Sequence, residues 1–216
     1  MLAEQSLQAM QTVQAHGPYQ LAGWSAGGVL AFEMARQLEQ QGEAVDLLVL
    51  IDSFNPALSG DPAVDMQDQA ALLLVLLADL VGCAVDELPL SVHDLRKVAH
   101  EQQIDVLLER AQQRQLLPSG WQHNDIQRLL ELFRVHYQAL YQYTPVSYGG
   151  QMILFETTDS LMQRHGQSLI ADWQSRTPVP IEVYRIAGNH YTVMRRPSVT
   201  LLAQQLQACL ERGRTR

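Results

Sequence analysis

The sequence predicts an α/β fold with a mostly parallel sheet and a helical insertion. Short apolar runs alternate with segments of helical periodicity, the middle of the chain (65–143) carries helical patterns only, and strand-like runs return after it. One run, Leu47–Ile51, is continuously apolar between two aspartates, as in a strand of a parallel sheet buried on both faces. With 216 residues, of which 47% are hydrophobic, the chain is long enough to form one domain with its own core.

The first half is predicted to alternate helix and strand. Its expected elements are a helix marked by Leu7, Met10 and Val13 and stopped at Gly17-Pro18, a strand at 19–22, a helix at about 26–41 and a strand at 47–51. Gly42 lies where the second helix should end, because glycine readily adopts the left-handed conformation found after helices.

The second half begins with helices and ends with strands. Two apolar stripes mark helices in the middle, one with Ile104, Leu107, Leu108 and Ala111, the other with Ile126, Leu129, Leu130, Phe133, Tyr137, Leu140 and Tyr141. Such stripes indicate core packing rather than a cofactor site. The remaining expected elements are strands at 152–155 and 181–186 and a helix at about 198–211.

Composition excludes several functional classes. A net charge of −8 and a pI of about 5.3 argue against binding to nucleic acid or to an anionic membrane. Cys83 and Cys209 form no disulfide framework or zinc motif, and the longest strictly apolar run, Ala70–Ala78, is far below the ~20 residues of a membrane span. The first 17 residues lack a signal-peptide pattern. We therefore expect a cytoplasmic protein.

The pentapeptide Gly23-Trp24-Ser25-Ala26-Gly27 is the first candidate for chemistry. It has the pattern G-x-S-x-G, with an apolar strand before it and a helical pattern directly after it. A serine at such a sharp strand-to-helix turn is exposed as a nucleophile, beside the free N–H groups of the helix start. The alternative is a tight turn in which Ser25 only caps the helix.

A serine nucleophile needs a base and an acid that orients the base. His190 follows the strand expected at 181–186, and carboxyl ends of parallel strands meet at one edge of the sheet, where Ser25 also lies. The other six histidines lie before the nucleophile strand, in the helical middle or in a polar connection. For the acid, both Asp52 and Asp159 follow expected strands, so the residues alone leave both open.

Several segments of the chain resemble one known family in the same order. "GPYQLAGWSAGGVLAFEMARQL" is similar to its nucleophile segment and "VLIDSFNP" to its acid segment; "LLERAQQRQLLP", "YTPVSYGGQMILFET" and "IAGNHYTVMRRPSV" are similar to later segments. The family is the thioesterase domain of nonribosomal peptide synthetases and polyketide synthases, within the α/β-hydrolase superfamily. The similarity covers about residues 1–211.

The resemblance implies an α/β-hydrolase-like sheet, with residues 65–143 as a helical lid, and a serine thioesterase. Ser25 would be the nucleophile, His190 the base and the Ala26 N–H an oxyanion donor. In the assembly-line type the acid maps to Asp52, and in the stand-alone editing type it lies nearer Asp159. The substrate would be an acyl or peptidyl chain on the phosphopantetheine arm of a carrier protein, released by hydrolysis or cyclisation. No metal and no cofactor bound by the domain itself are implied.

One departure from the family concerns the N-terminal side. In the family, strands and a loop with a second oxyanion donor precede the nucleophile, whereas here the serine is already residue 25. The sequence thus predicts that the strand at 19–22 lies at a sheet edge, where it favours self-association, and that turnover is weak. Two alternatives to a catalytic assembly-line thioesterase remain: a truncated, non-catalytic thioesterase-like fragment and the stand-alone editing (type II) thioesterase.

Overall fold

The chain forms two compact units. The computed structural model describes residues 2–54, 65–159 and 168–213. Met1–Gly60 and Tyr143–Arg216 form the first, which we call the sheet unit, and Asp61–Gln142 form the second, the helical unit.

The sheet unit contains the predicted parallel sheet. Its four strands pair in the order β1-β2-β3-β4, all parallel, with bounds β1 Tyr19–Trp24, β2 Val45–Ile51, β3 Met152–Asp159 and β4 Glu182–Asn189. Among the described residues β1 is therefore an edge strand, as the sequence predicts. β3 and β4 extend beyond their expected ends, because the polar residues that follow the apolar runs still pair across the sheet.

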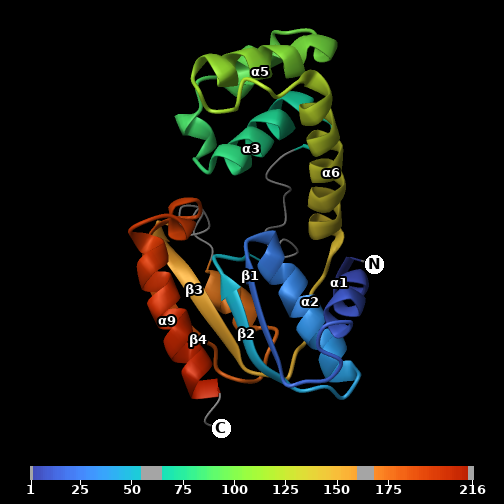
Figure 1. Ribbon diagram of the computed structural model, residues 1–216, viewed down its shortest axis with the longest axis vertical. Helices are drawn as coiled ribbons and strands as arrows, with labels where there is room; N and C mark the ends of the chain where they lie inside the picture. The colour runs from blue at the N-terminus through green and yellow to red at the C-terminus, as the bar shows by residue number, and fades with distance from the viewer. Residues whose placement is uncertain (1, 55–64, 160–167, 214–216) are drawn as a thin grey trace. The chain divides into compact units, whose positions relative to one another are not determined.

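Helices cover both faces of this sheet (Figure 1). α1 (Leu2–Gln11) and α2 (Ala26–Gln40) lie on one face, and α9 (Ser198–Gly213) lies on the other. Alternate residues of β2 divide between the faces: Leu47, Val49 and Ile51 pack with Leu202 and Cys209 of α9, so Leu48 and Leu50 point toward α2. The sheet is thus buried on both sides, as its continuous apolar strands predict.

Two details of this unit differ from the expected pattern. α1 ends at Gln11, so Val13 is not part of its apolar stripe and is 90% exposed. Thr12 and Val13 are β-branched and favour helices weakly, and Thr12 donates its hydroxyl to the carbonyl of Ala9, which closes a turn there. The short helix α8 (Leu169–Gln174) was not predicted; its Trp173 packs on Phe32 of α2 with ring centroids 4.9 Å apart.

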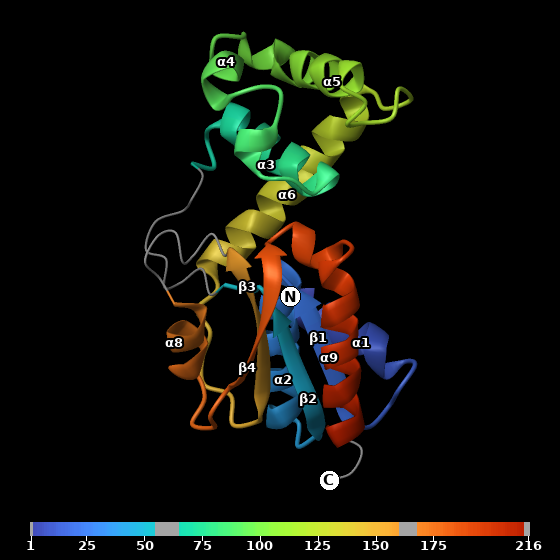
Figure 2. The ribbon, with the colours of Figure 1, turned by 90° about the vertical axis from the view of Figure 1, so that its left-hand side faces the viewer.

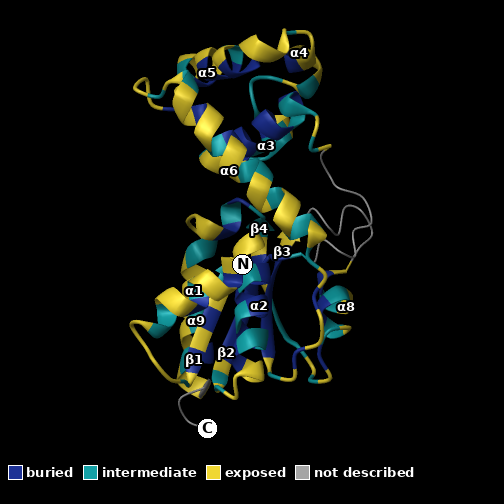
Figure 3. Ribbon diagram, turned by 90° about the vertical axis from the view of Figure 1, so that its right-hand side faces the viewer, coloured by how far each residue is buried: buried dark blue, intermediate teal, exposed yellow. Residues whose placement is uncertain are grey.

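The helical unit has its own apolar core. Its described helices are α3 Gln69–Val81, α4 Val92–Arg96, α5 Gln103–Gln113 and α6 His123–Gln142, with 3₁₀ turns at Val85–Glu87 and His100–Gln102 (Figure 2). The predicted stripe of α5 faces this core, which buries Leu107 and Ala111. Only the first part of the α6 stripe does so, with Ile126 and Leu130 buried; its last three residues, Tyr137, Leu140 and Tyr141, are not part of this core. Figure 3 shows α3 as largely buried.

The described residues 65–142 contain helices and turns and no strand, as predicted. None of the helices in the described ranges is long and apolar enough to cross a membrane.

Candidate active site

Ser25 occupies a strained turn between β1 and α2. Its backbone has φ 54° and ψ −129°, a region that non-glycine residues adopt at a cost and that recurs at functional sites. The turn is tied to the next strand, because the Ser25 N–H donates to the Ile51 carbonyl at 3.0 Å. The hydroxyl caps no helix N–H, so the helix-cap alternative does not describe this serine.

Two glycines permit this turn, Gly23 inside the pentapeptide and Gly28 just after it. A Cβ on Gly23 would lie 2.1 Å from the carbonyl oxygen of Gly27, so a side chain is excluded there. Gly27, by contrast, has nothing within 4 Å of a built Cβ, so this glycine of the pentapeptide relieves no crowding. The second crowded position is Gly28, whose Cβ would lie 1.9 Å from the hydroxyl oxygen of Ser53.

Asp52 directly follows β2 and is 4% exposed. Its backbone has a positive φ of 44°, and its N–H donates to the Phe155 carbonyl of β3 at 2.7 Å. One carboxylate oxygen, Oδ1, accepts from both the N–H (3.1 Å) and the hydroxyl (2.8 Å) of Thr157. These bonds compensate the buried carboxylate for lost water and fix its plane, leaving Oδ2 for another partner.

His190 follows β4 in a tight loop. The Asn189 side-chain oxygen accepts from the N–H groups of Tyr191 (3.0 Å) and Thr192 (2.9 Å). The Thr192 hydroxyl in turn accepts from the Asn189 N–H at 2.8 Å. Gly188, with φ 117°, supplies a conformation that other residues rarely adopt. The loop is thus closed by its own side chains, which fix the backbone on either side of His190.

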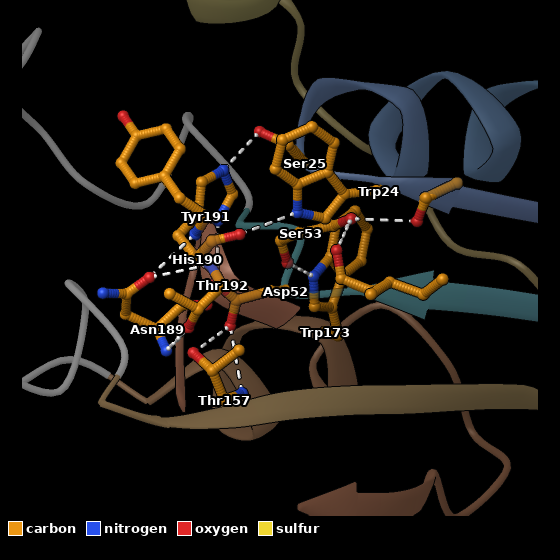
Figure 4. A network of polar contacts seen from close by, with 12 residues as sticks. Trp24, Ser25, Asp52, Ser53, Thr157, Trp173, Asn189, His190, Tyr191 and Thr192 are labelled. Carbon is orange, nitrogen blue, oxygen red and sulfur yellow. Dashed lines mark hydrogen bonds and ion pairs between the residues drawn. The ribbon is translucent and has the colours of Figure 1, made fainter. Parts of the chain in front are cut away.

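Three side chains that are distant in sequence form one hydrogen-bonded chain (Figure 4). His190 Nδ1 lies 2.7 Å from Asp52 Oδ2, and His190 Nε2 lies 3.0 Å from Ser25 Oγ. A carboxylate only accepts, so Nδ1 carries the proton and Nε2 has a free lone pair for the serine hydroxyl. This is the geometry that a serine nucleophile requires of a base and an orienting acid.

The imidazole lies between two aromatic side chains (Figure 4). Trp24 stacks on it with ring centroids 5.0 Å apart and an interplanar angle of 29°. Tyr191 meets it nearly perpendicularly, at 5.3 Å and 85°. The side chain of His190 is 13% exposed, so its ring is shielded but still accessible.

A second polar cluster lies on α2, the helix that follows Ser25. Glu33 accepts from Arg36 through two nitrogens (2.7 and 2.8 Å), from Gln37 (2.7 Å) and from the Tyr143 hydroxyl (2.7 Å). Burial opposes ionisation of Glu33, but these donors outweigh it and lower the pKa of the carboxyl. Burial, followed by the bond to Glu33, raises the pKa of Tyr143 well above its usual range. The cluster ties α2 to the point where the chain re-enters the sheet unit.

The candidate residues from the sequence thus divide clearly. Ser25, Asp52 and His190 come together, whereas Asp159 is exposed at the end of β3 and Asp52 takes the place beside His190 Nδ1. Ala26 begins α2 and is exposed, so its N–H lacks an intrahelical acceptor, as at any helix start. Sequence reasoning missed Thr157 and the stacking of Trp24, although the tryptophan stood inside the recognised pentapeptide.

Comparisons with known proteins agree with this architecture. A model of the thioesterase domain family matches residues 1–209. The nonribosomal peptide synthetase btyA of Aspergillus terreus is 26% identical over 97% of this chain and 23% of its own length. The chain therefore spans less than a quarter of that relative.

Solved structures give the same result. The four-domain nonribosomal peptide synthetase holo-AB3403 superposes with a TM-score of 0.84 at 28% identity, over 96% of this chain and 15% of that one. The NocB thioesterase domain, in covalent complex with a fluorophosphonate nocardicin G analog, superposes with a TM-score of 0.60 at 22% identity, over 97% and 73%. With its parallel sheet and its match over residues 1–209, the chain belongs to the thioesterase domain family, of the type carried by nonribosomal peptide and polyketide synthases.

Proposed function

We propose that this chain is a serine thioesterase that releases an acyl or peptidyl chain from the phosphopantetheine thioester of a carrier protein through an acyl-Ser25 intermediate. The observation that carries the proposal is the continuous contact from Ser25 through His190 to Asp52, at 3.0 and 2.7 Å. Asp52 in this place also favours the assembly-line type over the editing type, whose acid lies nearer Asp159.

The first half-reaction forms the acyl-enzyme. His190 Nε2 accepts the Ser25 proton while Oγ attacks the thioester carbonyl carbon, and Asp52 stabilises the imidazolium. The tetrahedral intermediate then collapses, the carbon–sulfur bond breaks, and His190 gives its proton to the departing phosphopantetheine thiolate. The products of this step are the ester on Ser25 and the free thiol of the carrier.

The second half-reaction frees the chain. Water, or a hydroxyl or amine of the acyl chain itself, gives a proton to His190 and attacks the ester carbonyl. His190 then returns this proton to Ser25 Oγ as the ester bond breaks. Water yields an acid and an internal nucleophile yields a ring, so exclusion of water decides the outcome.

The negative oxygen of both tetrahedral intermediates needs donors. The Ala26 N–H, at the positive end of the α2 dipole and next to the nucleophile, fits that role.

We also propose that the helical unit acts as the lid of this acyl site. Its insertion between β2 and β3 and its separate core support that role, because a lid moves as a body.

Turnover of a short acyl thioester, followed through release of the thiol, tests the proposal. We expect steady turnover that Ser25→Ala abolishes and that Ser119→Ala, a change of an exposed serine, leaves intact. Covalent labelling of Ser25 without turnover would instead favour the non-catalytic alternative, since labelling needs a nucleophile but no complete cycle. Turnover that survives in Ser25→Ala would refute the mechanism.

A further inference from the structure

Trp24 contacts His190 in two independent ways. Its indole ring stacks on the imidazole, with centroids 5.0 Å apart, and its Nε1–H donates to the His190 backbone carbonyl at 3.2 Å. In Figure 4 the indole lies beside the imidazole on the side opposite to Tyr191. One side chain therefore holds both the ring and the backbone of the base.

We propose that Trp24 is a positioning residue that sets the orientation of His190 against Ser25 and stabilises the imidazolium formed in each half-reaction. This inference rests on the proposed function of Ser25 and His190. It assigns a role to the variable position of the G-x-S-x-G pentapeptide, which otherwise serves only as a spacer between glycine and nucleophile.

The covalent connection makes Trp24 suited to this role. It immediately precedes Ser25, so a displacement of the strained turn moves the indole and the nucleophile together. Because the indole holds the imidazole, the base follows the same displacement. The 3.0 Å contact between Nε2 and Oγ is thus defined from the side of the nucleophile as well as from the side of Asp52.

The stacked Trp24 indole also stabilises the positive charge that His190 acquires during the reaction. Neutral imidazole becomes a cation when it takes the serine proton, and a cation within about 6 Å of an indole face is attracted by the electron-rich face. Tyr191, nearly perpendicular at 5.3 Å, limits rotation of the imidazole away from Trp24. The pair of aromatic rings therefore favours the charged, correctly oriented base.

Three variants separate these contributions. Trp24→Phe keeps an aromatic face but loses the N–H donor, and Trp24→Leu loses both. Val13→Ala is the control, because Val13 lies after α1 and is 90% exposed. Circular dichroism and thermal unfolding show whether each variant is folded. The measurements are kcat and KM for a short acyl thioester and the rate of Ser25 labelling by a phosphonate fluoride.

We expect Trp24→Leu to lower kcat and the labelling rate about 10- to 30-fold with KM nearly unchanged, since cation–π attraction and orientation act after binding. Trp24→Phe should recover most of this loss, and Val13→Ala should leave both rates unchanged. In a His190→Ala background, Trp24→Leu should have no further effect on the slow residual labelling, because it acts through the missing ring.

A proton NMR measurement separates failure of this inference from failure of the proposed function. The His190 Nδ1 proton, bonded to Asp52, should give a downfield signal that His190→Ala removes. We expect Trp24→Leu to broaden or abolish this signal, and Trp24→Phe and Val13→Ala to keep it, whether or not the chain turns over thioesters. An unaltered signal in Trp24→Leu, or labelling within twofold of wild type, would overturn the positioning role. So would an equal loss in the His190→Ala background.

Discussion

Asp52 Oδ2 reaches His190 Nδ1 at 2.7 Å across an intervening strand. Asp52 follows β2 and His190 follows β4, and β3 lies between them in the sheet. Asp159 ends β3 itself and pairs with Asn189, the neighbour of His190. His190 is therefore bonded to the aspartate of the more distant strand, and the Asp52 carboxylate lies over Thr157 of β3.

Replacing the two aspartates tests which one orients the base. Asp52→Asn should lower kcat about 10³- to 10⁴-fold, because an amide stabilises the wrong tautomer of the imidazole and cannot stabilise the imidazolium. Asp159→Asn, the matched control, should stay within about threefold, since an exposed carboxylate is easily replaced. Thioester turnover of both variants shows which aspartate orients His190. A larger loss in Asp159→Asn than in Asp52→Asn would assign that role to Asp159.

Thr157 explains how the carboxylate is held above β3. Thr157→Val removes the hydroxyl bond to Asp52 Oδ1 but keeps the backbone N–H bond. We expect a loss of about 10- to 150-fold in the rate of Ser25 labelling, because one bond to a buried charge contributes about 1.5–3 kcal/mol. Thr157→Ser retains the donor and should restore the rate. Equal rates in the wild type and in both variants would show that the backbone N–H of Thr157 alone is enough to hold the Asp52 carboxylate.

The Glu33 cluster predicts a pH-dependent stability. Because the folded-state pKa of Glu33 is lowered, its contribution is present above the unfolded value of about 4.3 and disappears as pH falls through the folded value. Glu33→Gln should lower the melting temperature at pH 7 by about 4–8 °C and flatten its decline in acid. Thermal unfolding at several pH values measures this.

The control for that experiment is Glu131→Gln, which changes an exposed glutamate of α6. This variant should leave the dependence of the melting temperature on pH unchanged. If Glu33→Gln retains the full acid sensitivity of the wild type, the cluster is not its source.

Among the described residues β1 pairs with β2 alone, and we expect the chain as given to self-associate through this edge. Its Ala22 side chain is exposed, and an uncharged edge invites pairing with a second chain. Ala22→Lys should shift the population toward monomer in light scattering after size exclusion, whereas Ala9→Lys on exposed α1 should not. A wild-type chain that is monomeric at all concentrations would contradict the expectation.

The sequence predicted local features better than long-range ones. The strand-to-helix turn at Ser25 and the parallel apolar strands follow from patterns within a few residues. The choice between Asp52 and Asp159 does not follow from such local patterns. Both residues follow strands of one sheet, and the order of the strands in the sheet cannot be derived from neighbouring residues. Thr157 was missed because the apolar run of β3 ends at Phe155, two residues before it, and element ends are the least certain part of such reading.

The identity of the nucleophile is the central claim, and intact-mass analysis after treatment with a phosphonate fluoride tests it most directly. The proposed mechanism predicts one covalent adduct per chain, mapped by peptide analysis to Ser25, no adduct in Ser25→Ala, and much slower labelling in His190→Ala. An adduct that persists in Ser25→Ala, or one that maps to another residue, would contradict it.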